Sequence, residues 1–154
     1  MEYVTASRMI QAPVETVFAT VSDIRSFSKA VDSVTRVEFL TEQQTGAGTR
    51  FRETRRMNGR EHTTELEVTE YILNERVRMV STAGGTVWDS VFTVRPVGEA
   101  AELTLVMDAE PQSMLAKVMM RLARKVVVRL LEADLDAVVQ YCEQHREQSN
   151  AGGH

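Results

Sequence analysis

The chain is poor in the features that mark secreted or membrane-spanning proteins. Its 154 residues include one cysteine, Cys142, so no disulfide can form within it. The N-terminal segment has neither a basic stretch nor an apolar core, so we expect no secretory signal peptide. No run of about 18 apolar residues is present, so we expect no membrane-spanning helix. These features together predict a cytoplasmic protein.

Several kinds of binding site are also missing from the sequence. The formal net charge is −4, which does not favour nucleic acid as a partner. The histidines, His62, His145 and His154, lack the spacing of metal ligands, and no pair of cysteines supports them. The glycines at 46–48 lack the following helix and the lysine of a phosphate-binding loop. We therefore expect no metal and no cofactor. The oligomeric state is left open between a monomer and a homodimer.

The composition is that of an ordinary globular protein, with 43% hydrophobic and 26% charged residues. A chain of this length can bury one substantial core. We expect a single domain over residues 1–146. Residues 147–154 are polar, rich in glycine and terminal, so we expect them to form a disordered tail.

The hydrophobic pattern predicts an α+β fold. Residues 2–10 alternate as a strand does, and apolar residues at helical spacing follow Pro13. Asp23 is placed to cap a second short helix. Further on, turn signals divide the chain into antiparallel strands; they are Asn58-Gly59, Asn74-Glu75, Gly84-Gly85 and a longer loop at 96–100.

A long helical pattern runs from Ser113 to about His145, which corresponds to roughly 45 Å of helix. Apolar residues at spacings of three and four predict the face that meets the sheet. This predicted seam consists of Leu115, Met119, Leu122, Val126, Leu130, Ala133 and Ala137.

Basic residues form a second stripe on the same helix, at Lys117, Arg121, Lys125 and Arg129. A solvated helix face has this pattern, and so does a basic amphipathic helix that meets a membrane surface or a carboxylate. We favour the solvated face, and the sequence leaves the membrane or carboxylate contact open.

The turn at Asn58-Gly59 fixes which residues of its two strands share a face. One face carries the cross-strand pairs Arg56–Glu61, Thr54–Thr63, Arg52–Glu65 and Arg50–Glu67, which suits exposure to water. The opposite, inner face carries Phe51–Leu66, Glu53–Thr64 and Arg55–His62. Two-residue turns further along place Ile72 on the inner face. They also place Glu70 there, unless a bulge intervenes.

The inward polar residues are Glu53, Arg55, His62 and Thr64, and they allow two interpretations. They lie at an open, solvated end of the sheet and pair with one another, or they line a pocket between sheet and helix. Burying such charges is costly unless they are paired. A few convergent polar groups over apolar walls are typical of a small-molecule site.

The stretches "IQAPVETVFATVSDIRSF" (10–27), "GAGTRFRETRRMNGR" (46–60), "ELEVTEYILNERVRM" (65–79) and "FTVRPVGEAAELTL" (92–105) resemble the START-like (SRPBCC) superfamily. More narrowly, the chain resembles its polyketide cyclase/dehydrase and lipid-transport-like family. The resemblance extends from residue 3 to about 145. It implies a helix-grip fold, in which a curved antiparallel sheet of about seven strands wraps around a long C-terminal helix. Two short helices follow the first strand.

The resemblance also implies a cavity between the sheet and the long helix. Mapped onto this sequence, the expected ligand-binding residues are Phe51, Glu53, Arg55, His62, Thr64, Leu66, Met79, Trp88, Ser90, Phe92, Leu105, Met107, Met119, Leu122 and Val126.

Three functions remain open, because this superfamily supports several activities on one scaffold. The first is binding or carriage of a hydrophobic small molecule that is lipid-like, polyketide or aromatic. The second is a polyketide cyclase/dehydratase-like enzyme, with Glu53, Arg55 and His62 as candidate acid/base residues. The third is a co-chaperone-like module that binds a partner through its outer sheet face. Whether the protein is an enzyme is not decided by the sequence.

Overall fold

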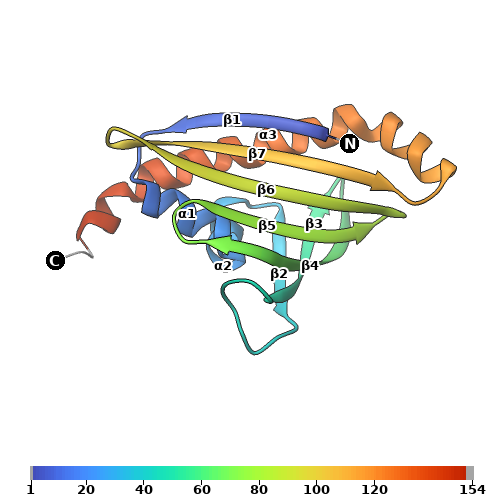
Figure 1. The fold of residues 1–154 in the computed structure, drawn as a ribbon, viewed down its shortest axis with the longest axis horizontal. Helices are drawn as coiled ribbons and strands as arrows, with labels where there is room; N and C mark the ends of the chain where they lie inside the picture. The colour runs from blue at the N-terminus through green and yellow to red at the C-terminus, as the bar shows by residue number, and fades with distance from the viewer. Residues whose placement is uncertain (1, 152–154) are drawn as a thin grey trace.

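Seven antiparallel strands form one curved sheet that holds the long C-terminal helix against its concave side (Figure 1). The structure, a computed structural model, describes the backbone of residues 2–151 and the side chains of residues 3–146. The strands are β1 (Glu2–Ile10), β2 (Val34–Phe39), β3 (Arg50–Met57), β4 (Arg60–Ile72), β5 (Arg76–Ala83), β6 (Thr86–Val97) and β7 (Ala100–Pro111). The helices are α1 (Val14–Ser22), α2 (Ile24–Ala30) and α3 (Met114–Ala151).

The strand order is β1-β7-β6-β5-β4-β3-β2, so each strand from β2 to β7 pairs with its neighbour in sequence and β1 closes onto β7. The two short helices follow β1 and cover one end of the concave face. This arrangement is the helix-grip fold that the sequence predicts. Among the described residues, no helix combines the length and apolar character needed to cross a bilayer.

The β3–β4 hairpin has the register that its Asn-Gly turn predicts. Arg50 lies opposite Glu67, Arg56 lies opposite Glu61, and Met57 lies opposite Arg60. The β5–β6 hairpin also has its predicted two-residue turn, with Ala83 opposite Thr86. Both turns use glycines with positive φ, which is the backbone conformation that such tight turns require.

The β4–β5 hairpin differs from the prediction because its turn has three residues, 73–75. Asn74 takes the left-handed conformation, with a φ of 61°, and Tyr71 rather than Ile72 lies opposite Val77. Tyr71 therefore packs inward and Ile72 is exposed. A bulge between Val68 and Glu70 then returns the preceding residues of β4 to their predicted faces, although Val68 pairs with Met79 rather than with Ser81. Glu70 consequently points outward, where it pairs with Arg76 of β5 at 3.1 Å.

The β6–β7 connection is also tighter than expected. Val97 lies opposite Ala100, so the turn consists of Gly98 and Glu99 alone rather than a longer loop. Gly98 has a φ of 61°, which suits a two-residue turn. Both strands therefore extend further than the sequence pattern indicates.

The predicted seam of α3 is wrong in its first half and at Ala133, which is exposed. Leu115, Met119, Leu122 and Val126 are exposed, and the face that packs onto the sheet is one position away. The buried residues of this face include Ala116, Met120, Leu135, Val138 and Cys142. The first half of α3 is apolar on two sides, so a spacing of three and four fits two different stripes. Contact with β1 and β7 decides which stripe is buried: the Tyr3 hydroxyl donates to the backbone carbonyl of Met120.

Helix α3 also continues past its expected end near His145, to Ala151. Residues 147–151, which we expected to be disordered, are therefore helical. The remaining residues of the expected tail, 152–154, lie outside the described part of the chain.

Candidate functional site

A cavity of about 120 Å³ lies between the concave face of the sheet, the two short helices and the middle of α3. A cavity of roughly this size can hold a ring such as benzene. Most of its walls are apolar. The lining residues are Val21, Ile24, Phe27, Glu53, Arg55, Leu66, Met79, Ser90, Phe92, Leu105, Leu131, Asp134 and Leu135.

Strand periodicity brings the polar lining residues to the cavity. Glu53 and Arg55 are two positions apart on β3, so both point to the same face of the sheet. Ser90 and Phe92 share the concave face of β6 for the same reason. From the opposite side, Leu131 and Asp134 are three positions apart on α3 and therefore lie on one face of that helix.

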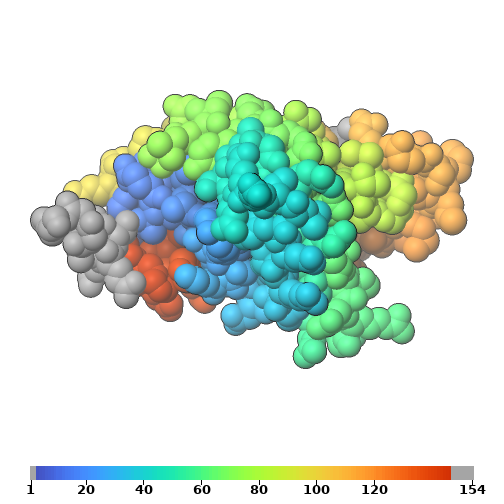
Figure 2. Space-filling model, turned by 90° about the horizontal axis from the view of Figure 1, so that it is seen from below, coloured from blue at the N-terminus to red at the C-terminus, as the bar shows by residue number. Residues whose placement is uncertain are grey.

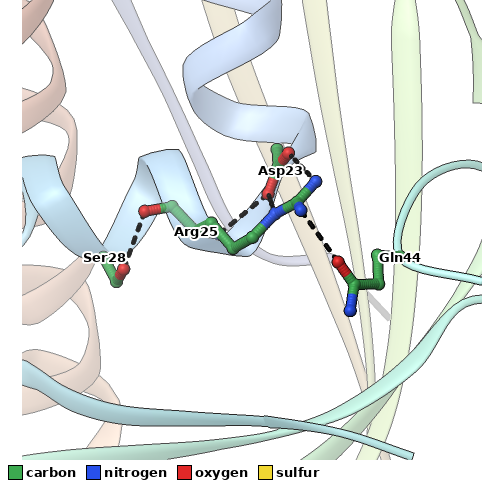
Figure 3. A network of polar contacts seen from close by, with 4 residues as sticks. All are labelled: Asp23, Arg25, Ser28 and Gln44. Carbon is green, nitrogen blue, oxygen red and sulfur yellow. Dashed lines mark hydrogen bonds and ion pairs between the residues drawn. The ribbon is translucent and has the colours of Figure 1, made fainter. Parts of the chain in front are cut away.

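Helix α2 contributes Ile24 and Phe27, and its start is held by a polar network (Figure 3). The Asp23 carboxylate accepts from the backbone N–H of Arg25 at 2.9 Å and from the Arg25 guanidinium at 2.8 Å and 3.0 Å. Arg25 also donates to the side-chain carbonyl of Gln44 at 2.8 Å. Burial opposes ionisation of Asp23, but the hydrogen bonds from Arg25 outweigh it and hold its pKa below the ordinary value. The predicted cap at Asp23 is confirmed.

A buried charge cluster closes one end of the cavity. Arg55 Nε donates to the Glu53 carboxylate, and Arg55 Nη1 donates to Asp134 Oδ2 at 2.8 Å. The side chains of Glu53 and Asp134 are each 11% exposed and that of Arg55 is 19% exposed. The Arg55 guanidinium also lies over the ring of Phe27, 5.7 Å from its centroid. One cation thus bridges two carboxylates from opposite walls of the cavity.

The electrostatics of the cluster differ between its members. Burial alone would lower the pKa of Arg55, but the charges and hydrogen bonds of Glu53 and Asp134 raise it. Burial raises the pKa of Asp134 above its ordinary value, and the charge and hydrogen bond of Arg55 offset this only in part. With both carboxyls ionised the cluster carries one net negative charge, and burial favours the protonated form of Asp134.

Seven of the residues expected to bind a ligand line this cavity: Glu53, Arg55, Leu66, Met79, Ser90, Phe92 and Leu105. The structure brings the candidate acid/base residues Glu53 and Arg55 together. It leaves out His62, which is exposed beyond the end of the cavity, and half-buried Thr64.

The remaining expected residues lie elsewhere. Phe51 is buried in the core, where its ring packs against Phe39. Met107 and Trp88 belong to a second cluster, in which Trp88 packs against Tyr3 with ring centroids 5.1 Å apart. Met119, Leu122 and Val126 are on the exposed side of α3, for the reason given for the seam, and do not line the cavity.

Sequence reasoning missed six lining residues: Val21, Ile24, Phe27, Leu131, Asp134 and Leu135. The first three were predicted to be helical, but nothing in the pattern shows that α1 and α2 cover this part of the sheet. Asp134 is the most informative omission. It lies between Glu132 and Asp136, and only the correct packed face of α3 identifies it as the inward carboxylate.

Solved structures of similar fold support this architecture. A Thermus thermophilus protein is 23% identical with a TM-score of 0.66, and the match covers 95% of this chain and 97% of that one. Ara h 8.0201 is 10% identical with a TM-score of 0.67, covering 90% and 95%. StfQ, a di-domain ARO/CYC protein from the steffimycin biosynthetic pathway, is 13% identical with a TM-score of 0.76, covering 96% of this chain and 51% of StfQ. At these sequence identities the similarity shows a shared fold and no more.

No curated protein sequence is significantly similar to this chain. A family model described as "Polyketide cyclase / dehydrase and lipid transport" matches residues 1–143, which include every element except the end of α3. The match agrees with the helix-grip architecture. The chain therefore belongs to the polyketide cyclase/dehydrase and lipid transport family, within the START-like (SRPBCC) superfamily.

Proposed function

We propose that this protein binds and carries a hydrophobic small molecule with a polar group at one end. The observation that carries the proposal is the cavity itself, whose apolar walls end at the cluster of Glu53, Arg55 and Asp134. Apolar walls favour the body of the ligand, and a few fixed polar groups orient it. Family membership and the fold of Ara h 8.0201 and StfQ are consistent with such a role.

The size of the cavity limits the kind of ligand. About 120 Å³ is below the roughly 300–1,000 Å³ of a site that encloses a drug-sized molecule. The cavity therefore holds one ring or one end of a chain, and a larger ligand needs α3 or α2 to move outward. A hydroxyl group on the ligand can donate to the Glu53 or Asp134 carboxylate, whose oxygens accept more than one hydrogen bond each.

Titration with 1-anilinonaphthalene-8-sulfonate, a fluorescent aromatic probe, tests the proposal. The protein should bind this probe saturably, and Ser90→Phe should abolish binding by filling the cavity from its β6 wall. Thr93→Phe is the matched control, because Thr93 lies on the same strand with its side chain exposed. Circular dichroism checks that both variants fold. Equal binding by all three proteins would place the probe outside the cavity and contradict the proposal.

A second candidate function is catalysis, for which the raised pKa of Asp134 is the supporting observation. A carboxyl that stays protonated closer to neutral pH is suited to general acid/base work on a keto chain. We infer that such an enzyme would use Asp134 with Glu53 and Arg55, and not His62. Asp134→Asn should then abolish turnover of a poly-β-keto thioester while the anilinonaphthalene probe still binds. Unchanged turnover would exclude this role.

A co-chaperone-like function stays a prediction. It needs a partner site on the outer sheet face, where ion pairs such as Arg78–Asp89 and Arg95–Glu102 already join neighbouring strands. A cytoplasmic location and the choice between monomer and homodimer also stay predictions.

A further inference from the structure

The first half of α3 presents a continuous apolar stripe to solvent. Leu115 and Leu122 are 73% and 76% exposed, and the other members of the stripe are at least half exposed. The stripe consists of Met114, Leu115, Val118, Met119, Leu122 and Val126. Both views show these first turns of α3, in orange, extending past the end of the sheet (Figures 1 and 2). Isolated exposed apolar residues are ordinary, but a contiguous set on one element marks a contact surface.

Charge on this part of the helix is of one sign. Residues 112–131 contain five basic residues and no acidic residue. The rest of the chain contains 13 basic and 22 acidic residues, so it is strongly negative. The basic residues are Lys117, Arg121, Arg124, Lys125 and Arg129. The segment is therefore a cationic patch on an anionic protein.

Helical geometry places the two kinds of side chain next to each other. Successive residues are rotated by about 100° around the helix axis. Ala116 and Met120 face the sheet, and Leu122 points to roughly the opposite side. Arg121 falls at one border of the apolar stripe, and Lys125 and Arg129 lie on the same side of the helix as the stripe, toward its C-terminal end. Their long side chains can keep their charged ends in a polar layer while the apolar stripe is buried.

We propose that the first half of α3 docks on the surface of an anionic lipid bilayer. An interfacial helix combines an apolar face with Lys and Arg on the adjoining polar face, and here Lys117, Arg121 and Arg124 adjoin the exposed apolar stripe. Anionic headgroups match the five positive charges, and each such charge strengthens binding roughly fivefold. A second copy of this helix is a poor occupant, because pairing the two stripes would bring together two sets of five positive charges.

The docking surface lies close to the cavity along α3, although the two occupy different sides of the helix. Leu131, which lines the cavity, follows Val126 by five residues, or about 7.5 Å along the helix. The docking site itself rests on the exposed stripe and its charge, and does not depend on the proposed carrier function.

Vesicle flotation tests this proposal on the full chain. We expect binding to phosphatidylcholine vesicles that contain phosphatidylglycerol, and roughly tenfold or more weaker binding to phosphatidylcholine alone. Leu115→Ser/Leu122→Ser should weaken binding roughly tenfold or more, because two apolar side chains no longer enter the bilayer. Arg121→Gln/Lys125→Gln/Arg129→Gln should also weaken it, and high salt should have the same effect on the unmodified protein.

Matched variants control for loss of any exposed residue. Leu73→Ser removes a leucine of similar exposure, 67%, from the β4–β5 turn. Arg52→Gln/Arg56→Gln/Arg95→Gln removes three exposed arginines from the outer sheet face. Both should bind vesicles as the unmodified protein does. Circular dichroism and probe binding in the cavity should be unchanged in every variant, so failure of docking is distinguishable from failure of the carrier function.

Three results would overturn the proposal. One is the absence of binding to anionic vesicles. Another is equal loss of binding in the α3 variants and their controls. The third is a homodimer in light scattering that Leu115→Ser/Leu122→Ser converts to monomer, which would assign the stripe to self-association.

Discussion

At the scale of single residues, Arg55 is the centre of the site. It is the cation that allows two carboxylates to be buried at one end of an apolar cavity. Burying an ion is costly, and removing one partner of a buried pair leaves the other uncompensated. The cluster therefore offers polar groups to a ligand, and the stability of the fold depends on keeping all three of its charges.

Replacement of Arg55 should be strongly destabilising. Arg55→Met leaves Glu53 and Asp134 buried without a cation, and we expect a loss of about 3–5 kcal/mol in the free energy of unfolding. Arg56→Met is the matched control, because Arg56 is exposed on the outer face and should change stability by less than about 1 kcal/mol. Urea denaturation measures both. Equal effects would show that the cluster is not buried as described.

The pKa shifts predict opposite pH dependences for two aspartates. The pKa of Asp134 is raised in the folded protein by burial, so the stability that it contributes is present at low pH and is lost as pH rises through the raised pKa. The hydrogen bonds from Arg78 lower the pKa of Asp89, so its contribution is present above the ordinary aspartate pKa and is lost on acidification.

Unfolding free energies at several pH values test these signs. Relative to Asp134→Asn, the unmodified protein should lose stability as pH rises from the acid range. Relative to Asp89→Asn, the unmodified protein should gain stability as pH rises through the acid range. Two difference curves with the same slope would contradict the assignment.

At the scale of elements, turns and caps decide how much of the structure the sequence predicts. The β3–β4 and β5–β6 hairpins were predictable, because a two-residue turn with glycine fixes every cross-strand pair. The β4–β5 hairpin was not, because Asn74 takes a left-handed conformation and a bulge near Thr69 compensates for it. These two irregularities cancel, so the strands on either side still face as expected.

Helix α2 should depend on its cap. Asp23→Ala removes the side chain that accepts from the backbone N–H of Arg25 and from its guanidinium, and should cost about 0.5–2 kcal/mol in the free energy of unfolding. Probe binding should also weaken, since Ile24 and Phe27 line the cavity from this helix. Asp32→Ala, at an exposed position after the helix, is the control and should have little effect. Equal losses in the two variants would contradict the role of the cap.

At the scale of the whole molecule, the order of elements was sufficient to predict the helix-grip fold. The site was predicted less completely. The sheet face gave seven lining residues, because alternation along a strand assigns each residue to a face. None of the residues predicted on helix α3 lines the cavity. The first half of this helix is apolar on two sides, and only packing against β1 and β7 determines which side is buried. Asp134 and the residues of α1 and α2 depend on how helices cover the sheet, which local patterns do not contain.

The central claim is that the space beneath α3 receives a hydrophobic guest. Backbone amide NMR during titration with 1-anilinonaphthalene-8-sulfonate tests it most directly, because it locates the bound probe. We predict saturable shifts at the amides of Glu53, Ser90, Phe92 and Asp134, around the cavity walls. Shifts confined to residues 114–126, or no saturable shifts, would contradict the claim.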